Sequence, residues 1–82
     1  MGYHKRKIEK GTYGKFSKIK EEFQELEDAV EQDITILKLV ELSDLLGAIE
    51  AYAETQGISM DELRKFNKLT KSAFKDGTRK SK

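Results

Sequence analysis

The sequence has no cysteine, no proline and no tryptophan, and it contains a single histidine. The absence of Cys excludes disulfides, thiolate metal sites and Cys nucleophiles, and it is compatible with a reducing cytoplasm. No apolar run approaches the roughly 20 residues that span a bilayer, and the basic N-terminus has no hydrophobic signal core behind it. We therefore expect a soluble, cytoplasmic protein without a membrane partner.

The length of 82 residues corresponds to one domain, 1–82. A chain of this size hides only about 60 to 65% of its unfolded surface, so a lone monomer is modestly stable and partner chains are expected. The lack of Pro, together with abundant Glu, Lys, Leu and Ala, favours long helices. These features predict an all-α fold that assembles into an oligomer.

Charge is unevenly distributed along the chain, although the net charge is only +1. Residues 1–20 carry seven basic residues against one acid, and residues 63–82 carry eight against one. Residues 21–62 carry thirteen acids against Lys38 alone. Either the acidic middle and the basic ends neutralise each other in the fold, or the middle binds cations while basic residues hold an anion beside them.

Three helices are predicted from periodicity and capping signals. The first runs from about residue 17 to 31, where apolar residues recur at spacings of three and four. The second runs from about 35 to 55, with Asp33 or Thr35 as its cap, Gly57 as a left-handed terminator and apolar residues around most of its circumference. The third begins at the capping-box pair Ser59 and Glu62 and stops near Gly77. The stripe of the first helix comprises Phe16, Ile19, Phe23, Leu26 and Val30.

Residues 1–16 show no convincing period and predict a basic loop or short extended segment, packed over the helices by Tyr3, Ile8 and Tyr13. We expect no catalytic histidine chemistry from His4, which lies in this basic segment. The run G-T-Y-G at 11–14 predicts a turn, and close approach of its glycines to a phosphate is the alternative. Residues 78–82 are expected to form a frayed tail.

Four acids occupy positions that a simple solvated surface does not explain. At about 100° per residue, Glu22 and Glu25 form a ledge beside the apolar stripe of the first helix. Glu41 and Asp44 lie among apolar residues of the second helix, on the side that faces a neighbour. A buried carboxylate without a partner is strongly destabilising, so these acids need a cation or a basic residue from the ends of the chain.

An antiparallel hairpin with its turn near residues 32 and 33 would bring the two pairs of acids level. Glu22 and Glu25 precede the turn by about as many residues as Glu41 and Asp44 follow it. Four converging carboxylates shift their pKa values upward unless a multivalent cation neutralises them. Mg²⁺ or Mn²⁺ is expected in preference to Zn²⁺, because no Cys or suitably placed His is available.

The same residues carry a resemblance to a known family. E-E-F-Q-E at 21–25 followed by E-L-S-D at 41–44 is similar to the E-E-x-x-E then E-x-x-D signature of the all-α nucleoside triphosphate pyrophosphohydrolases. The runs G-T-Y-G-K-F-S-K-I and V-E-L-S-D-L-L-G-A-I-E-A-Y look most like the small MazG-like proteins of phages and bacteria. The likeness is concentrated in residues 15–55, and Ala51 stands where many longer MazG proteins carry Asn.

The resemblance implies Mg²⁺-dependent hydrolysis of an NTP or dNTP to the monophosphate and pyrophosphate, with a metal-activated water as nucleophile. It implies that the catalytic carboxylates and metal ligands are Glu22, Glu25, Glu41 and Asp44, with Glu21 as an outer member. It also implies a helical hairpin that pairs with a second chain into a four-helix bundle, as a homodimer or a dimer of dimers. The candidates for contact with the triphosphate, each with a solvated-surface role as its alternative, are Lys15, Lys18, Asn67 and Lys71.

The competing interpretation is a non-catalytic helical binding module that holds nucleic acid or an acidic partner with its basic ends. It explains the charged ends of the chain equally well. It leaves Glu41 and Asp44 without a role, so a nucleotide rather than a nucleic acid is the expected partner.

Overall fold

The computed structural model describes residues 4–75, which form three helices and no strand. Helix α1 spans Phe16–Gln32, α2 spans Thr35–Thr55 and α3 spans Met60–Lys75. The all-α class and the three predicted helices are confirmed. The predicted frayed tail and the Tyr3 contact lie outside the described residues. None of the described helices is long and apolar enough to cross a membrane.

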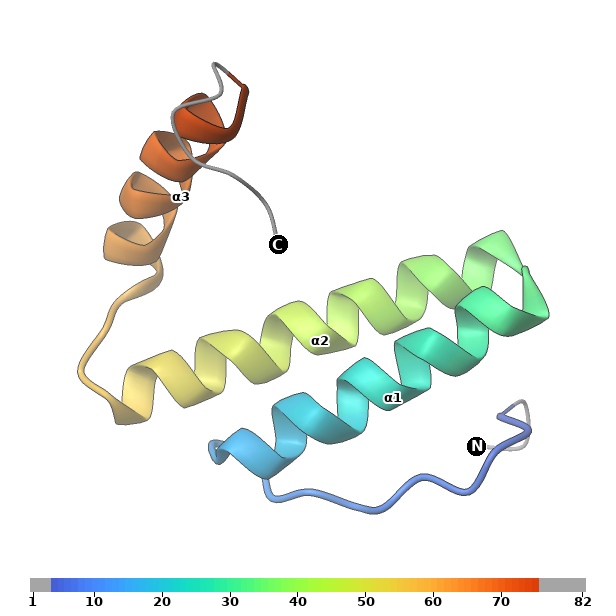
Figure 1. Cartoon of the computed structure of the whole chain (residues 1–82). Helices are drawn as coiled ribbons and strands as arrows, with labels where there is room; N and C mark the ends of the chain where they lie inside the picture. Colours follow the sequence, from blue (N-terminus) through green and yellow to red (C-terminus); the bar gives the residue numbers. More distant parts are fainter. Residues whose placement is uncertain (1–3, 76–82) are drawn as a thin grey trace.

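Helices α1 and α2 form an antiparallel hairpin and lie side by side over most of their length (Figure 1). Asp33 ends α1 in the left-handed conformation, with φ of 55°. The prediction that Asp33 or Thr35 caps α2 is wrong, because the N-cap position is Ile34, which has no side-chain cap. The Asp33 carboxylate instead accepts a hydrogen bond of 2.7 Å from Lys38 Nζ.

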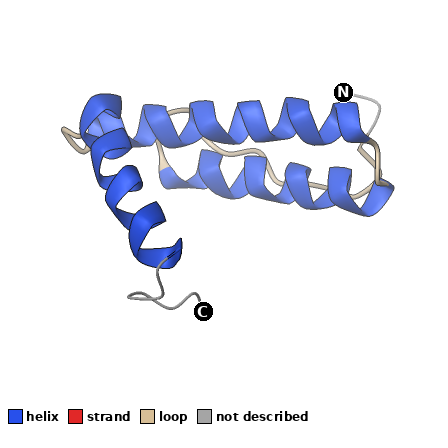
Figure 2. Cartoon of the chain, turned by 90° about the horizontal axis from the view of Figure 1, so that it is seen from above, coloured by secondary structure: helices blue, strands red, loops and turns tan. Residues whose placement is uncertain are grey.

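Helix α3 leaves the far end of α2 and projects away from the hairpin (Figures 1 and 2). Gly57, with φ of 76°, provides the left-handed residue predicted after α2. The capping box is also confirmed: Glu62 N–H donates to Ser59 Oγ at 3.2 Å, and Ser59 N–H donates to Glu62 Oε1 at 3.1 Å. None of the α3 side chains is buried.

Residues 4–11 form an extended segment, here called the N-terminal strap, which runs beside α1 in the opposite direction (Figure 1). At one end Lys5 N–H donates to Asp28 Oδ2 at 3.2 Å, and at the other Gly11 N–H donates to Glu21 Oε1 at 2.8 Å. A side chain at Gly11 would clash with the backbone of Ser17. Glycine therefore permits the strap to lie directly against the first turn of α1.

The turn predicted at residues 11–14 is confirmed, because Lys15 N–H donates to Thr12 O at 2.9 Å and Gly14 has φ of 87°. Ile8 is half-buried, consistent with packing of the strap on the hairpin. Tyr13 is 76% exposed, so the prediction that it packs over the helices is wrong in the single chain.

The packing of the hairpin is unusual because its buried apolar residues are all small. The only described apolar residues that are buried are Ala29, Ala48, Ala51 and Ala53. Phe16 and Tyr52 contact each other edge to face, with ring centroids 6.1 Å apart. The large apolar side chains that remain exposed on the hairpin include Phe23, Val30, Ile36, Leu39, Leu42 and Leu46.

Candidate metal centre

Helix α1 presents three carboxylates as one ledge on the side that faces α2 and the strap. Glu21, Glu22 and Glu25 each offer an oxygen, and these atoms lie within 4.8 Å of one another. Glu21 and Glu22 are buried, and Glu25 is half-buried. The helical repeat explains this proximity, because residues three and four apart share a face.

Helix α2 supplies two further carboxylates at the same level. Glu41 is completely buried, whereas Asp44, one turn further along, is exposed. Oxygens of Glu22, Glu41 and Asp44 lie within 4.8 Å of one another. The hairpin thus brings the four predicted acids into overlapping groups, as the spacing of the two motifs anticipates.

Two oxygens in this cluster are buried without a hydrogen-bond partner among the described residues: Glu22 Oε1 and Glu41 Oε1. A buried carboxylate oxygen that accepts no hydrogen bond is costly and rare in folded proteins. Oxygen-only ligands of this kind are those that Mg²⁺ and Mn²⁺ prefer. The donor set therefore fits a hard divalent cation.

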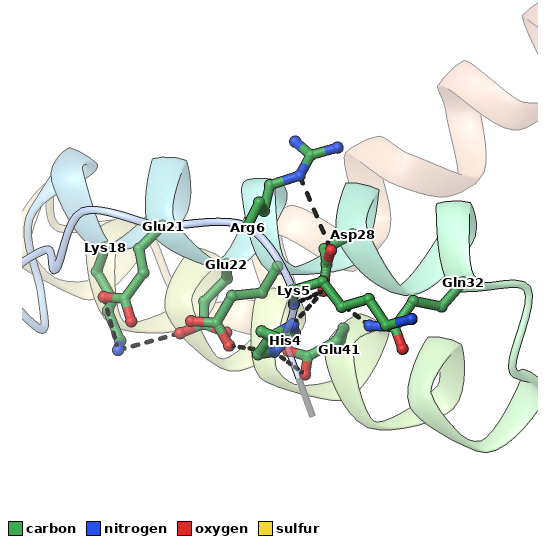
Figure 3. Close-up of polar contacts among 10 residues, drawn as sticks. His4, Lys5, Arg6, Lys18, Glu21, Glu22, Asp28, Gln32 and Glu41 are labelled. Atoms are coloured by element: carbon green, nitrogen blue, oxygen red, sulfur yellow. Dashed lines mark hydrogen bonds and ion pairs between the residues drawn. The ribbon is translucent and has the colours of Figure 1, made fainter. Parts of the chain in front are cut away.

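Lys18 is the cation that the helix itself brings to the ledge. Its Nζ lies 3.1 Å from Glu21 Oε1 and 3.0 Å from Glu22 Oε2 (Figure 3). The hydrogen bond to Glu22, reinforced by that to Glu21, raises the pKa of the Lys18 ammonium despite its partial burial. Lys18 therefore neutralises the outer part of the cluster but leaves Glu22 Oε1 without a partner.

The N-terminal strap inserts His4 into the inner part of the cluster, between Asp28 and Glu41 (Figure 3). Its Nε2 lies 3.1 Å from Glu25 Oε1 and 3.0 Å from Glu41 Oε2, and its Nδ1 lies 2.8 Å from Asp28 Oδ2. Burial opposes charge on the imidazole, but hydrogen bonding to Asp28 and the negative charges of Glu41 and Glu25 outweigh it and raise the His4 pKa. The expectation that no histidine is suitably placed beside these carboxylates is wrong, because His4 shares a group with Glu25 and Glu41.

Asp28 is a second residue that the sequence did not reveal. It is 2% exposed, and its Oδ2 accepts hydrogen bonds from the His4 ring, from Lys5 N–H and from Gln32 Nε2. The hydrogen bond from His4, with help from the other two donors, holds the Asp28 pKa below its usual range. In the sequence Asp28 is one acid in an acid-rich helix, and only the path of the strap distinguishes it.

Glu25 has the most perturbed carboxyl group of the cluster. Burial is the main cause that raises its pKa to about 7, and hydrogen bonding with Glu21 acts in the same direction. The charges of Glu22 and Glu41 raise it further, whereas His4 opposes the shift. The predicted upward shift is confirmed for Glu25. The pKa of Glu21 is instead lowered, since hydrogen bonds from Gly11 and Lys18 outweigh its burial.

A hollow of about 370 Å³ adjoins the outer part of the cluster. This volume lies within the range of about 300 to 1,000 Å³ that is typical of small-molecule sites. Its lining includes a carboxylate from each helix, a lysine, a hydroxyl group, a glycine and an aromatic ring. The lining residues are Tyr13, Lys18, Glu22, Ser43, Asp44, Gly47 and Ala48.

Of the four candidates for phosphate contact, the structure brings only Lys18 to the cluster. Lys15 occupies the N-cap position of α1 and is exposed on another hollow beside Tyr52. Asn67 and Lys71 lie exposed on α3, which projects away from the hairpin.

Comparisons with protein-family models, curated proteins and solved structures found no match to this chain. The chemistry of the centre must therefore be inferred from its residues and their geometry.

Proposed function

We propose that the protein is a Mg²⁺-dependent nucleoside triphosphate pyrophosphohydrolase of the small MazG-like kind. The observation that carries this proposal is the convergence of Glu22, Glu41 and Asp44 from two helices, with oxygens within 4.8 Å of one another. Two oxygens of this group are buried without a hydrogen-bond partner in the part of the chain that the structure describes. A structural cluster of ion pairs would leave neither of them unsatisfied.

Glu22, Glu41 and Asp44 would hold the ion, with Glu25 beside them on the same ledge of α1. When bound, Mg²⁺ supplies charge neutralisation to the phosphates and lowers the pKa of an attacking water. A carboxylate of the cluster then accepts the proton from that water. Glu25, which lies beside the other carboxylates on the ledge of α1, is placed to take this role.

The hollow beside Asp44 supplies room for the substrate. Lys18 Nζ lies at its edge and can turn from Glu22 towards a phosphate oxygen. Gly47 lines open space in the hollow, since a Cβ atom added there would meet no described atom within 4 Å. The exposed ring of Tyr13 borders the same space and can cover a bound nucleotide.

A second chain that pairs with the α1–α2 hairpin to form a four-helix bundle is part of this proposal. Leu39, Leu42 and Leu46 recur at spacings of three and four on α2, yet they are 62%, 54% and 52% exposed. Such a stripe is the packing seam of helical bundles. A homodimer or dimer of dimers would cover it.

The alternative of a nucleic-acid-binding module receives less support from the described residues. Arg6, one of the basic residues of the strap, forms ion pairs with α1. Its Nη2 lies 2.6 Å from Glu31 Oε1, and its Nη1 lies 3.4 Å from Glu27 Oε1. Lys18 is similarly held by two acids. Part of the basic N-terminal region therefore neutralises α1 rather than forming a uniform surface for phosphates.

The test is pyrophosphate release from a panel of canonical and damaged nucleoside triphosphates, with and without Mg²⁺. We expect release from at least one of them with Mg²⁺, and loss of it in Asp44→Asn. Asp61→Asn, the same change on exposed α3, is the matched control and should keep wild-type activity. A wild type inactive on every nucleotide, or an Asp44→Asn variant as active as wild type, would contradict the proposal.

A further inference from the structure

The inner part of the cluster differs in chemistry from the outer part. His4, Glu25 and Glu41 offer one imidazole nitrogen and two carboxylate oxygens, all within 4.8 Å of one another. The outer group of Glu22, Glu41 and Asp44 offers oxygens only. Glu41 belongs to both groups. We propose that His4, Glu25 and Glu41 form a second metal site, selective for a transition-metal dication such as Zn²⁺ over Mg²⁺.

The separations of the ligand atoms fit a shared ion. His4 Nε2 lies 3.1 Å from Glu25 Oε1 and 3.0 Å from Glu41 Oε2. Two ligand atoms bound about 2.1 Å from one ion lie about 3.0 Å apart when they subtend a right angle, and about 3.4 Å apart in a tetrahedron. The two separations from His4 Nε2 therefore need only a small increase to reach the tetrahedral value.

The second ring nitrogen of His4 is already in the arrangement that metal-binding histidines use. Asp28 is ionised and can only accept, so His4 Nδ1 carries the proton of their 2.8 Å hydrogen bond. A carboxylate bound to the opposite ring nitrogen orients Nε2, which donates its proton to Glu25 and Glu41 in the metal-free protein and would release that proton on binding a metal. Asp28 is fixed in turn by Lys5 N–H and by Gln32.

The imidazole ligand determines which ion is expected, and Glu41 links this site to the outer group. Imidazole nitrogen suits Zn²⁺, Co²⁺ and Ni²⁺, whereas Mg²⁺ requires oxygen ligands. Glu41 also has a completely buried oxygen, Oε1, for which the described residues provide no hydrogen-bond partner. The two oxygens of the Glu41 carboxylate can therefore bind two different ions. An ion at the His4 site and Mg²⁺ at the outer site would then share Glu41 as a ligand.

The inference uses the same carboxylate cluster as the proposed function, but it requires no hydrolysis. The chain contains one histidine, so the imidazole signals in a long-range ¹H–¹⁵N spectrum of the untagged protein report this site alone. We expect one equivalent of Zn²⁺ to shift the His4 Nε2 resonance in the manner of a metallated nitrogen. Mg²⁺ at the outer site should shift it less, because it would bind Glu41 but not the imidazole. An Nε2 resonance that Zn²⁺ does not move, or that Mg²⁺ moves equally, would overturn the inference.

Variants provide the affinity measurement by calorimetric titration with Zn²⁺. Second-shell partners of metal-binding histidines typically contribute about 10- to 100-fold in affinity, so we expect about tenfold for Asp28→Asn and on the order of 10² for His4→Gln. Lys5→Gln is the matched control, because Lys5 reaches Asp28 through its backbone N–H and should bind Zn²⁺ like wild type. Zn²⁺ affinity unchanged in His4→Gln would contradict the site.

The His4→Gln substitution could detach the N-terminal strap from α1 and so change more than one ligand. Glu25→Gln is therefore a second test, because Glu25 is a ligand on α1 and not on the strap. Glu25→Gln should also weaken Zn²⁺ binding. A Glu25→Gln variant that binds Zn²⁺ with wild-type affinity would contradict the site. The two proposals can fail separately. Pyrophosphate release with Mg²⁺ and an unmoved Nε2 resonance would refute only the second site, whereas a metallated Nε2 in a protein inactive on all nucleotides would refute only the enzyme.

Discussion

The two faces of α2 reverse the usual distribution of side chains between interior and surface. The face towards α1 carries a completely buried glutamate, Glu41, followed by the buried Ala48 and Ala51. The opposite face carries leucines that are half exposed or more, among them Leu39 and Leu46. Folding is normally driven by burying the large apolar residues, not the charged ones.

On the two proposals above, the inner face of α2 serves a cation and the outer face serves a second chain. Alanine methyl groups bury little apolar area, and a buried carboxylate opposes folding unless it is neutralised. The buried carboxylate of the inner face is therefore explained by a bound cation. The exposed leucines of the outer face are explained by packing against another surface. The following predictions, in order of expected effect, test this division.

The largest effect should come from the outer face. A double variant, Leu39→Asp with Leu46→Asp, places charges on the apolar stripe, and each buried leucine contributes about 1.5 to 3 kcal/mol. Because the small alanine core cannot compensate for the loss, we expect dissociation to monomers and extensive unfolding, measured by sedimentation and circular dichroism. Glu50→Lys, on an exposed polar position of α2, is the control. A folded wild-type monomer at micromolar concentration would contradict this assignment of the outer face.

The second effect concerns the inner face. Glu41→Gln preserves volume but removes a charged ligand, so turnover should fall by on the order of 10², as for other preorganised electrostatic groups. The metal-free variant should have nearly the stability of wild type, because removing a charge that raises the Glu25 pKa offsets the loss of the ion pair with His4. Glu54→Gln, exposed on the same helix, should change neither quantity. A strongly destabilised Glu41→Gln would show that Glu41 acts mainly as the ion-pair partner of His4.

The third effect is stabilisation by the ion itself. A ligand that binds only the folded state at ten times its Kd stabilises it by about 1.4 kcal/mol. For a chain of this size that corresponds to roughly 6 to 11 °C in melting temperature. Mg²⁺ should produce such a rise in wild type and much less in Asp44→Asn. No rise at millimolar Mg²⁺, with or without a nucleotide, would argue against the outer site.

The smallest effect is a pH dependence of the metal-free protein. The folded pKa of Glu25, about 7, lies above its ordinary value of 4.5, so the folded state binds the proton more tightly and loses stability as pH rises through this window. The raised His4 pKa acts in the same direction at higher pH, because its stabilising charge is lost as pH rises through the folded value. The melting temperature should therefore be higher at pH 5.5 than at pH 8.

Two observations would sharpen or refute this pH effect. Glu25→Gln should flatten the profile between pH 5 and 7, and Mg²⁺ should reduce the slope because it favours the ionised carboxylate. Below about pH 4 the lowered pKa values of Glu21 and Asp28 reverse the trend, since protonation removes their stabilising hydrogen bonds. A metal-free protein more stable at pH 8 than at pH 5.5 would contradict the coupling.

The sequence by itself determined the helices and the register of the hairpin. Helical periodicity is local, so the apolar stripe of α1 and the capping box of Ser59 and Glu62 can be identified without knowledge of the tertiary fold. The nearly symmetric placement of Glu22 and Glu41 about the turn was sufficient to predict that their carboxylates meet. The cap of α2 was missed because Asp33 adopts a left-handed conformation and reaches Lys38 instead.

Only the tertiary structure shows that His4 lies against Asp28 and Glu41. His4 is 24 residues from Asp28 and 37 from Glu41 in sequence, and no periodic pattern connects them. The strap follows α1 because its backbone N–H groups and His4 find acceptors on that helix, and because Gly11 can approach the backbone of Ser17 without a side chain. Long-range electrostatic contacts and close backbone approach leave no pattern in local residue spacing, so the contacts of His4 could not be predicted from the sequence.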